Sequence, residues 1–398
     1  MNDRLDIEQK LLALLIAESP DASPFLTEIL SSTDDFDWER FAALVERHRV
    51  GALVYAGLQQ FSAINPPGDL VRHFSGKTSE NAEYYMRAVK LASELMEAFS
   101  KQGIACASLK GVGIAAEYYA APSQRQMIDV DLLVAPDRYA EAEQIVAAHG
   151  FELFYPDFDL TEQSRETFMA LHNAFTFIRK SDGMQLDLHW RMVPNPSLMP
   201  WIDQLWSQSV VGTTIGGQTI PMLPAAMHCV YICVHGAKSG WVRLKWLADV
   251  DHVVRGLSDQ EAGEAAEIFA SDDLQRIGAV SLALAERVLG TPIPAAFADL
   301  MQHDVSDLID LELGMMFEDM PSRPHSLKDW AHYRDRFRHS VLLKSGGGYR
   351  RHALLRELAR PRDLATISVK PGRFWVLGVL SPILGMGRAL KRLVAAKP

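Results

Sequence analysis

The run MIDVDLLV, residues 127–134, constrains the fold more than any other part of the sequence. Apolar residues alternate in it with Asp129 and Asp131, and a period of two predicts a β-strand with one apolar face. The two carboxylates share the other face, about 6–7 Å apart along the strand. Because unpaired carboxylates this close repel each other, we expect a bound cation or a basic partner beside them.

Further strands and helices are predicted on both sides of this run. The segment IACASL, residues 104–109, is typical of a buried strand and ends at Lys110 and Gly111, before a helix over 112–120. A helix over 136–150 and the strand FELFY, 151–155, come next. HNAFTFIRK and MQLDLHWRM flank Ser-Asp-Gly and predict a hairpin, as does VVGTTIGGQTIPML around its Gly-Gly turn. In MQLDLHWRM the alternation places Asp187, His189 and Arg191 opposite the core face.

The flanking sequence is helical in pattern. Asp37 is positioned to cap a helix over 38–61, and Tyr85, Val89, Ala92, Met96 and Phe99 mark the buried face of a long helix ending near Gly103. Helical patterns resume after Pro224. We therefore predict an α+β fold in which a small mixed β-sheet core lies between N-terminal and C-terminal helical regions. The predicted divisions are 1–100 (helical), 101–222 (α/β core), 223–345 (helical) and 346–398 (basic segment).

Composition restricts the class of protein. The chain has 398 residues, 48% of them hydrophobic, with 40 basic and 50 acidic side chains and a net charge of −10. These values are typical of a globular chain with more than one folding unit and exclude a disordered one. Net acidity argues against a general nucleic-acid binder. An acidic, helical start without a signal-peptide pattern and an odd number of cysteines, three, predict a cytoplasmic protein.

The last part of the chain reverses the charge balance. Residues 341–398 contain twelve Lys and Arg against two acids. The apolar stretch 374–387 is too short to span a membrane, which takes about 20 residues. Two interpretations remain open: the basic C-terminal segment contacts a membrane surface or an acidic partner, or Phe374, Trp375 and Leu377 dock it onto the body of the protein.

The pattern of acids indicates a metal site. Asp187, from a strand near the Asp129–Asp131 strand, would add a third carboxylate. Mg²⁺ prefers a few carboxylates together with phosphate oxygens, and Mn²⁺ is an alternative. Lys110 and Gly111 stand where a strand passes into a helix, and backbone N–H groups there can hold phosphate. His189 faces the acids, where it either contacts substrate or makes a structural hydrogen bond. This order of elements indicates phosphoryl or nucleotidyl transfer.

The runs LKGVGIAAEYYAAPSQRQMIDVDLLV and MQLDLHW resemble an uncharacterised bacterial nucleotidyltransferase family within the DNA polymerase β superfamily. Weaker similarity extends over most of the chain. The resemblance implies that Asp129 and Asp131 are the paired metal-binding acids, that Asp187 is the third, and that the Lys110–Gly111 turn is the nucleotide-phosphate loop. It also implies a phosphate contact for Arg125. The loop departs from the superfamily's usual Gly-Ser or Gly-Gly, which leaves its grip on the triphosphate open.

The function expected on this basis is Mg²⁺-dependent transfer of NMP from an NTP, such as ATP, to a hydroxyl or phosphate of a peptide or small-molecule acceptor. Relatives of the family occur beside lasso-peptide biosynthesis genes, which suggests a peptide acceptor. Two alternatives stay open at this level. The same metal site would also serve a kinase that transfers the terminal phosphate, and a degenerate site would serve a non-catalytic nucleotide- or peptide-binding protein.

Overall fold

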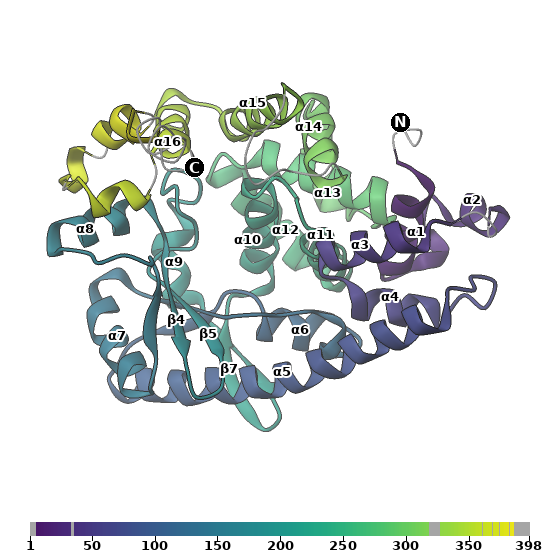
Figure 1. The fold of residues 1–398 in the computed structure, drawn as a ribbon, viewed down its shortest axis with the longest axis horizontal. Helices are drawn as coiled ribbons and strands as arrows, with labels where there is room; N and C mark the ends of the chain where they lie inside the picture. The colour runs from purple at the N-terminus through teal and green to yellow at the C-terminus, as the bar shows by residue number, and fades with distance from the viewer. Residues whose placement is uncertain are drawn as a thin grey trace, which may run out of the picture.

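The structure is a computed structural model. It describes residues 5–32, 36–317, 327–359, 361–367, 369–373, 375–381 and 383–385. Helices surround a single mixed sheet, and both helical regions predicted from the sequence are present (Figure 1).

The N-terminal region is a set of short helices followed by one long helix. They are α1 (Ile7–Ile16), α2 (Leu26–Ser31), α3 (Trp38–His48), α4 (Gly51–Leu58) and α5 (Gly68–Lys101). Asp37 caps α3 as predicted, accepting a hydrogen bond from the Arg40 backbone N–H. The continuous helix predicted over 38–61 is wrong. Arg49 adopts a left-handed conformation, with φ of 56°, and ends α3 before α4 begins.

The long helix α5 lies against the sheet and lines one of its faces (Figure 1). Ala92, Met96 and Phe99 of the predicted face are buried, whereas Tyr85 and Val89 are partly buried at its margin. The helix ends at Lys101, close to the predicted end at Gly103. Hydrophobic side chains at helical spacing therefore identified the face that packs on the sheet.

Seven strands form the sheet in the order β3-β4-β5-β2-β1-β7-β6. Their bounds are β1 (Cys106–Ser108), β2 (Val130–Val134), β3 (Glu152–Tyr155), β4 (Ala174–Arg179), β5 (Met184–His189), β6 (Val211–Ile215) and β7 (Gln218–Met222). Both predicted hairpins, β4–β5 and β6–β7, are antiparallel. The central strand β2 runs antiparallel to β1 and parallel to β5. The strand predicted from Met127 begins only at Val130, because β1 ends at Ser108 opposite Leu132 and offers 127–129 no partner.

Strand β2 is buried on both faces, unlike the one-sided strand that its alternation suggested. Val130, Leu132 and Val134 pack into a core with α5 and α7 (Tyr139–Ala148). Leu133 packs into a second core on the opposite side, formed mainly by helices. Asp131 shares the Leu133 face, so its carboxylate lies under the C-terminal helices rather than in open solvent.

Most of the remaining helices cover that second face, whereas the helix over residues 162–171 contributes Phe168 and Leu171 to the first core. They are α6 (Val112–Tyr118), α8 (Glu162–Leu171), α9 (Ile202–Ser209), α10 (Ala225–Lys238), α11 (Leu244–Gly256), α12 (Asp259–Ser271), α13 (Gln275–Leu289), α14 (Ser306–Phe317), α15 (Leu327–Leu342) and α16 (Gly347–Leu358). Helices α1 to α4 share one hydrophobic core with α10, α11 and α13, although about 170 residues separate them in sequence. Chain order and spatial grouping therefore differ.

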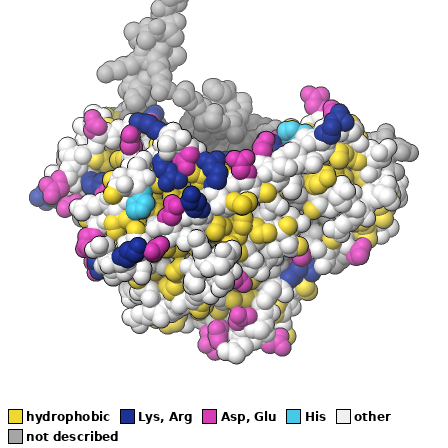
Figure 2. Space-filling model, turned by 90° about the horizontal axis from the view of Figure 1, so that it is seen from below, with side chains coloured by type: hydrophobic (Ala, Val, Ile, Leu, Met, Phe, Trp, Pro, Cys, Tyr) yellow, Lys and Arg dark blue, Asp and Glu magenta, His cyan; other side chains and the backbone are white. Residues whose placement is uncertain are grey.

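The C-terminal segment packs beside α8 (Figure 1). Leu377 is fully buried there, as the docking interpretation predicts. Trp375, by contrast, is 48% exposed, and Phe374 lies outside the described residues. On the face seen in Figure 2, Lys and Arg side chains alternate with Asp and Glu and do not form one basic stripe.

In the described part of the chain, every helix falls short of the length and apolarity that crossing a membrane requires. Cys106, Cys229 and Cys233 are buried free thiols.

Candidate active site

Two parallel strands bring the central acids together. Asp131 on β2 lies directly opposite Asp187 on β5 in the strand register. His189 follows two residues later on the same face of β5. Carboxylate oxygens of the two acids and a ring nitrogen of His189 all lie within 4.8 Å of one another. The hairpin prediction therefore placed Asp187 on the correct face, and the parallel pairing with β2 completes the juxtaposition.

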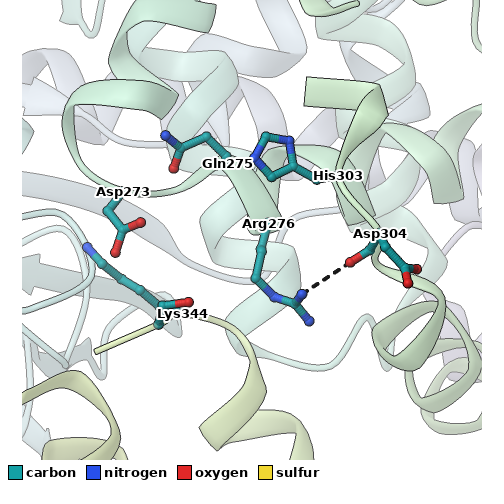
Figure 3. Close-up of a pocket in the computed structure, with 7 residues that line it drawn as sticks. Asp273, Gln275, Arg276, His303, Asp304 and Lys344 are labelled. Carbon is teal, nitrogen blue, oxygen red and sulfur yellow. Dashed lines mark hydrogen bonds between the residues drawn. The ribbon is translucent and has the colours of Figure 1, made fainter. Parts of the chain in front are cut away.

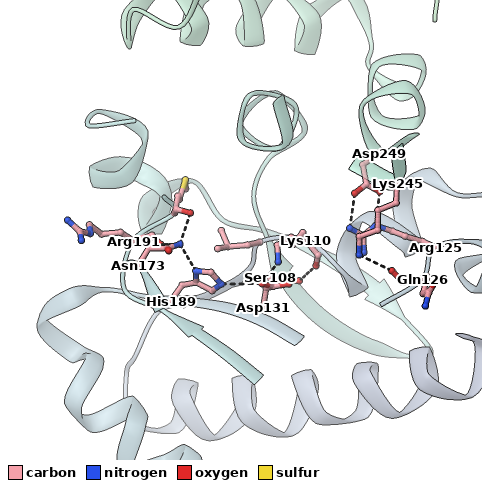
Figure 4. Close-up of polar contacts among 12 residues, drawn as sticks. Ser108, Lys110, Arg125, Gln126, Asp131, Asn173, His189, Arg191, Lys245 and Asp249 are labelled. Atoms are coloured by element: carbon pink, nitrogen blue, oxygen red, sulfur yellow. Dashed lines mark hydrogen bonds and ion pairs between the residues drawn. The ribbon is translucent and has the colours of Figure 1, made fainter. Parts of the chain in front are cut away.

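Asp131 is the most deeply held of these acids. Its side chain is 1% exposed, pairs with the Lys110 ammonium and lies 3.1 Å from His189 Nε2 (Figure 4). Burial opposes ionisation, but Lys110 and His189 outweigh it and hold the pKa of this carboxyl well below its usual range. Its second oxygen, Oδ2, is buried without a hydrogen-bond donor among the described residues. Asp131 Oδ2 is therefore available as a ligand for a cation.

The pKa of Asp187 shifts in the opposite direction from that of Asp131. Burial, followed by repulsion from Asp131 and Asp129, raises the pKa of Asp187 to about 6. Such repulsion is what a divalent cation relieves when it binds between carboxylates. The donor set of Asp131 and Asp187, with an orphaned buried oxygen, therefore fits a metal ion.

The position of Asp129 differs from the prediction. It lies in the bend before β2, half-buried, and does not belong to the group within 4.8 Å. Its charge still acts on the site, because it raises the pKa of both Lys110 and Asp187. The sequence pattern placed Asp129 and Asp131 on one strand, whereas the third position of the compact cluster is filled by His189.

A hydrogen-bond network fixes the role of His189. Asn173 Nδ2 lies 3.0 Å from His189 Nδ1, and it also donates to the carbonyl of Met192 at 3.1 Å. Since a carbonyl can only accept, this nitrogen is a donor, and His189 Nδ1 must accept. The ring proton then resides on Nε2, which donates to Asp131 Oδ1. His189 therefore makes the structural hydrogen bond that was one of its two predicted roles. Asn173, which orients the ring, is a residue that sequence reasoning missed.

The Lys110–Gly111 turn adjoins the acids. Gly111 has φ of +64°, and a side chain there would approach Met127 Sδ to 3.4 Å. His228 Nε2 of α10 lies 2.7 Å from the Leu109 carbonyl oxygen, and this hydrogen bond ties the strand end before the turn to α10. In the structure the Lys110 ammonium pairs with Asp131, so a direct contact with nucleotide phosphate stays a prediction.

Arg125 lies in a buried ion pair. Its Nε and Nη2 donate to Asp249 Oδ1 and Oδ2 of α11 at 2.7 and 2.8 Å (Figure 4). The Tyr119 hydroxyl donates to the same carboxylate at 2.7 Å. Burial opposes the charge of Asp249, but Arg125 outweighs it and lowers the pKa. The pair joins the loop before β2 to the helical region, and the predicted phosphate contact of Arg125 remains untested.

Polar side chains to which the sequence pattern gave no role approach the acids from the helices. On α10, Tyr231, His235 and Lys238 recur at intervals of four and three, a helical spacing that could have identified this face. Lys245 of α11 lies 3.3 Å from the Gln126 carbonyl, and burial lowers its pKa to about 7. The acids therefore face two lysines, Lys238 and Lys245, across the site, whereas burial lowers the pKa of His235 well below its ordinary value and leaves its ring uncharged.

A separate cavity of about 360 Å³ lies by α13 and the 343–346 linker (Figure 3). Its basic residues are already engaged. Lys344 donates to the Ser197 carbonyl at 3.0 Å, and Arg276 pairs with Asp307 at 2.9 Å. The acid cluster is the better candidate for chemistry.

A family model described as "Uncharacterised nucleotidyltransferase" matches residues 34–290, which include the sheet, the acids and helices α10 and α11. The chain belongs to this nucleotidyltransferase family. One similar solved structure is that of an antigenic nucleotidyltransferase-like protein from Paracoccidioides brasiliensis, with 17% identity and a TM-score of 0.30 over 52% of this chain and 94% of the other. No curated protein matches the chain. The family and the α+β architecture agree with the expectations from sequence, and the protein is a transferase that acts on a nucleotide substrate.

Proposed function

We propose that this nucleotidyltransferase transfers NMP from an NTP to a hydroxyl or phosphate of a peptide or small-molecule acceptor, with Mg²⁺ or Mn²⁺ held by Asp131 and Asp187 and assisted by Asp129. The juxtaposition of Asp131 and Asp187 across parallel strands, with Asp131 Oδ2 unpaired, supports the proposal most directly. A bound divalent cation would neutralise the carboxylates and phosphate oxygens and lower the pKa of the attacking hydroxyl.

The reaction is an in-line displacement. An acceptor oxygen attacks the α-phosphorus, the bond to the oxygen bridging to the β-phosphorus breaks, and pyrophosphate leaves. Lys110 and His189 keep Asp131 ionised and fixed in orientation, and Asn173 keeps the proton of His189 on Nε2. Lys245 adds positive charge beside Asp129. Positioning and charge stabilisation of this kind supply most of the rate in phosphoryl transfer.

The test uses Asp187→Asn and Asp131→Asn, with the exposed Asp159→Asn as a matched control. We expect both site variants to lose Mn²⁺ binding in calorimetry and to lose transfer by more than 100-fold, consistent with losses of one charge-stabilising group. Asp187→Asn should keep its melting temperature, because a neutral amide removes the repulsion that raises the pKa of Asp187. Retained metal binding and turnover in both site variants would refute the site.

Separate labelling of the phosphates distinguishes nucleotidyl from phosphoryl transfer. Acceptors, beginning with peptides, are incubated with NTP labelled at the α- or the γ-phosphate. Label from the α-phosphate alone supports the proposal. Label from the γ-phosphate alone would mean that the same site works as a kinase.

We also propose that the C-terminal segment contacts an anionic membrane surface. Trp375, Val379 and Ile383 recur every four residues and are 48%, 56% and 56% exposed. No acid follows Asp363 in the sequence, whereas six Lys and Arg do. An exposed apolar face beside cations is typical of segments that lie on anionic lipid. Cosedimentation with phosphatidylglycerol vesicles, lost in Val379→Glu and absent with phosphatidylcholine, is the expected result; equal recovery with both lipids would contradict it.

A further inference from the structure

A second cavity, of about 210 Å³, lies where the C-terminal segment meets the end of α10, and one of its lining residues, Lys238, is close enough to the acid cluster for the charge of Asp131 to act on it. Loop 194–198, the end of α10, α15 and α16 form its walls. The basic residues lining it are Lys238, Arg336 and Arg356, and the acid lining it is Glu357. Arg336 already lies 3.7 Å from Glu357, so the two compensate each other. Among the described residues, Lys238 and Arg356 form no ion pair with a carboxylate, although Glu357 attracts Arg356 at longer range.

Lys238 lines this cavity, and the charges of Asp131 and Lys110 also act on it. Within the described chain, its ammonium has no hydrogen bond and no ion pair. Burial lowers the pKa of Lys238 to about 8; repulsion from Lys110 and Arg356 acts in the same direction, and Asp131 opposes it. Charged groups of the acid cluster and of the cavity therefore both act on the pKa of Lys238. A half-buried ammonium that forms no ion pair within the described residues is available to bind an anionic ligand.

Arg356 keeps most of its hydrogen-bonding capacity. One of its five N–H groups donates to the Pro194 carbonyl at 3.0 Å, which orients the guanidinium. Burial lowers the pKa of Arg356 to about 10, and Arg191 nearby adds to this. A planar guanidinium and an ammonium lining one cavity are the groups that proteins use to bind phosphate.

The cavity also lies partly outside the region that defines the family. The family match ends at residue 290, whereas Arg336, Arg356 and the remaining residues from α15 and α16 follow it. Functions shared by the whole family, such as binding the nucleotide, are expected within the matched residues. A cationic cavity built mostly from residues beyond them suits the substrate that varies between enzymes, which is the acceptor.

We propose that this cavity binds a phosphate group of the acceptor, with Lys238 and Arg356 as its ligands. The inference rests on the proposed transfer reaction, since it names the acceptor's chemistry. A phosphate carries up to two negative charges, which match the two cations. The acceptor then lies with one end in the cavity and its attacking oxygen toward Asp131 and Asp187.

The test measures binding of inorganic phosphate to the full chain by calorimetry, alone and with a saturating, non-hydrolysable NTP analogue and Mn²⁺. Wild type is expected to bind phosphate under both conditions. Lys238→Met should weaken binding at least tenfold, Lys238→Arg should restore it, and Lys90→Met, which removes a 76% exposed lysine on α5, should leave it unchanged. Loss of phosphate binding when the analogue is present would overturn the acceptor assignment in favour of the nucleotide.

Two further readouts keep the test decisive. Without phosphate, Lys238→Met should melt at or above the wild-type temperature, because the variant loses a half-buried cation that repels Lys110 and Arg356, and added phosphate should no longer raise it. A lower melting temperature with an intact phosphate-induced rise would overturn the proposal. Asp131→Asn should keep phosphate binding, so failure of the metal site and failure of this cavity give different results.

Discussion

The buried pair between Arg125 and Asp249 leads to a quantitative prediction. Both side chains are at most 5% exposed and are joined by two hydrogen bonds of 2.7 and 2.8 Å. Arg125→Met leaves the Asp249 carboxylate buried, with the Tyr119 hydroxyl as its remaining hydrogen-bond donor among the described residues. Breaking one side of a buried pair costs about 3–5 kcal/mol. With an unfolding entropy of about 2.1 cal/mol/K per residue over 398 residues, that cost lowers the melting temperature by about 4–6 °C.

The assay is a double-mutant cycle with Asp249→Asn, which removes the charge but keeps an acceptor for Tyr119. We expect each single variant to melt several degrees below wild type and the double variant to lose clearly less than the sum of the two. Additive losses, or a loss of under about 1 °C in Arg125→Met, would refute the reasoning. If Arg125 also contacts phosphate, transfer in the double variant should be as impaired as in Arg125→Met even where both are fully folded; if it only joins the two regions, transfer should follow stability.

Three further predictions follow from the same structure. Arg125 holds the pKa of Asp249 below its ordinary 3.8, so the ion pair stabilises the fold fully above pH 3.8 and loses this effect as the pH falls below it. The difference in melting temperature between wild type and the double variant should therefore shrink from pH 5 to pH 3. Asn173→Leu should lower transfer about tenfold and weaken Mn²⁺ binding, as loss of an outer-shell partner does elsewhere, with little change in nucleotide affinity in calorimetry. Gly236→Ala should destabilise the fold by about 1–3 kcal/mol in denaturant unfolding, because its Cβ would stand 2.1 Å from the buried Trp241 ring, whereas Gly263→Ala, with open space at its Cβ, should not.

Much of the local structure could be predicted because short-range geometry determines it. The alternation in β2 and β5, the hairpin turns, the Asp37 cap and the buried face of α5 all follow from backbone periods of two and 3.6 residues. The same alternation placed Asp131 and Asp187 on the correct strand faces. It failed at Met127–Asp129, where the sequence pattern continues but the neighbouring strand has ended.

The divisions predicted at residues 100, 222 and 345 remain predictions, as does the cytoplasmic location. Sequence order suggested separate N-terminal and C-terminal helical regions, yet α1 to α4 share a core with α10, α11 and α13. Apolar periodicity shows that a helix face is buried; it does not show against which partner.

By itself, the sequence determined the elements, the faces of the acids and the resemblance to nucleotidyltransferases. Only the tertiary structure decided which groups meet: Asp131 opposite Asp187, His189 in the compact cluster in place of Asp129, Arg125 with Asp249 across 124 residues, and Lys238 beside Arg356. The physical reason is that a residue's secondary structure depends on its near neighbours in the chain. The partners of a buried charge, and therefore its role, depend on strand register and helix packing that join distant segments.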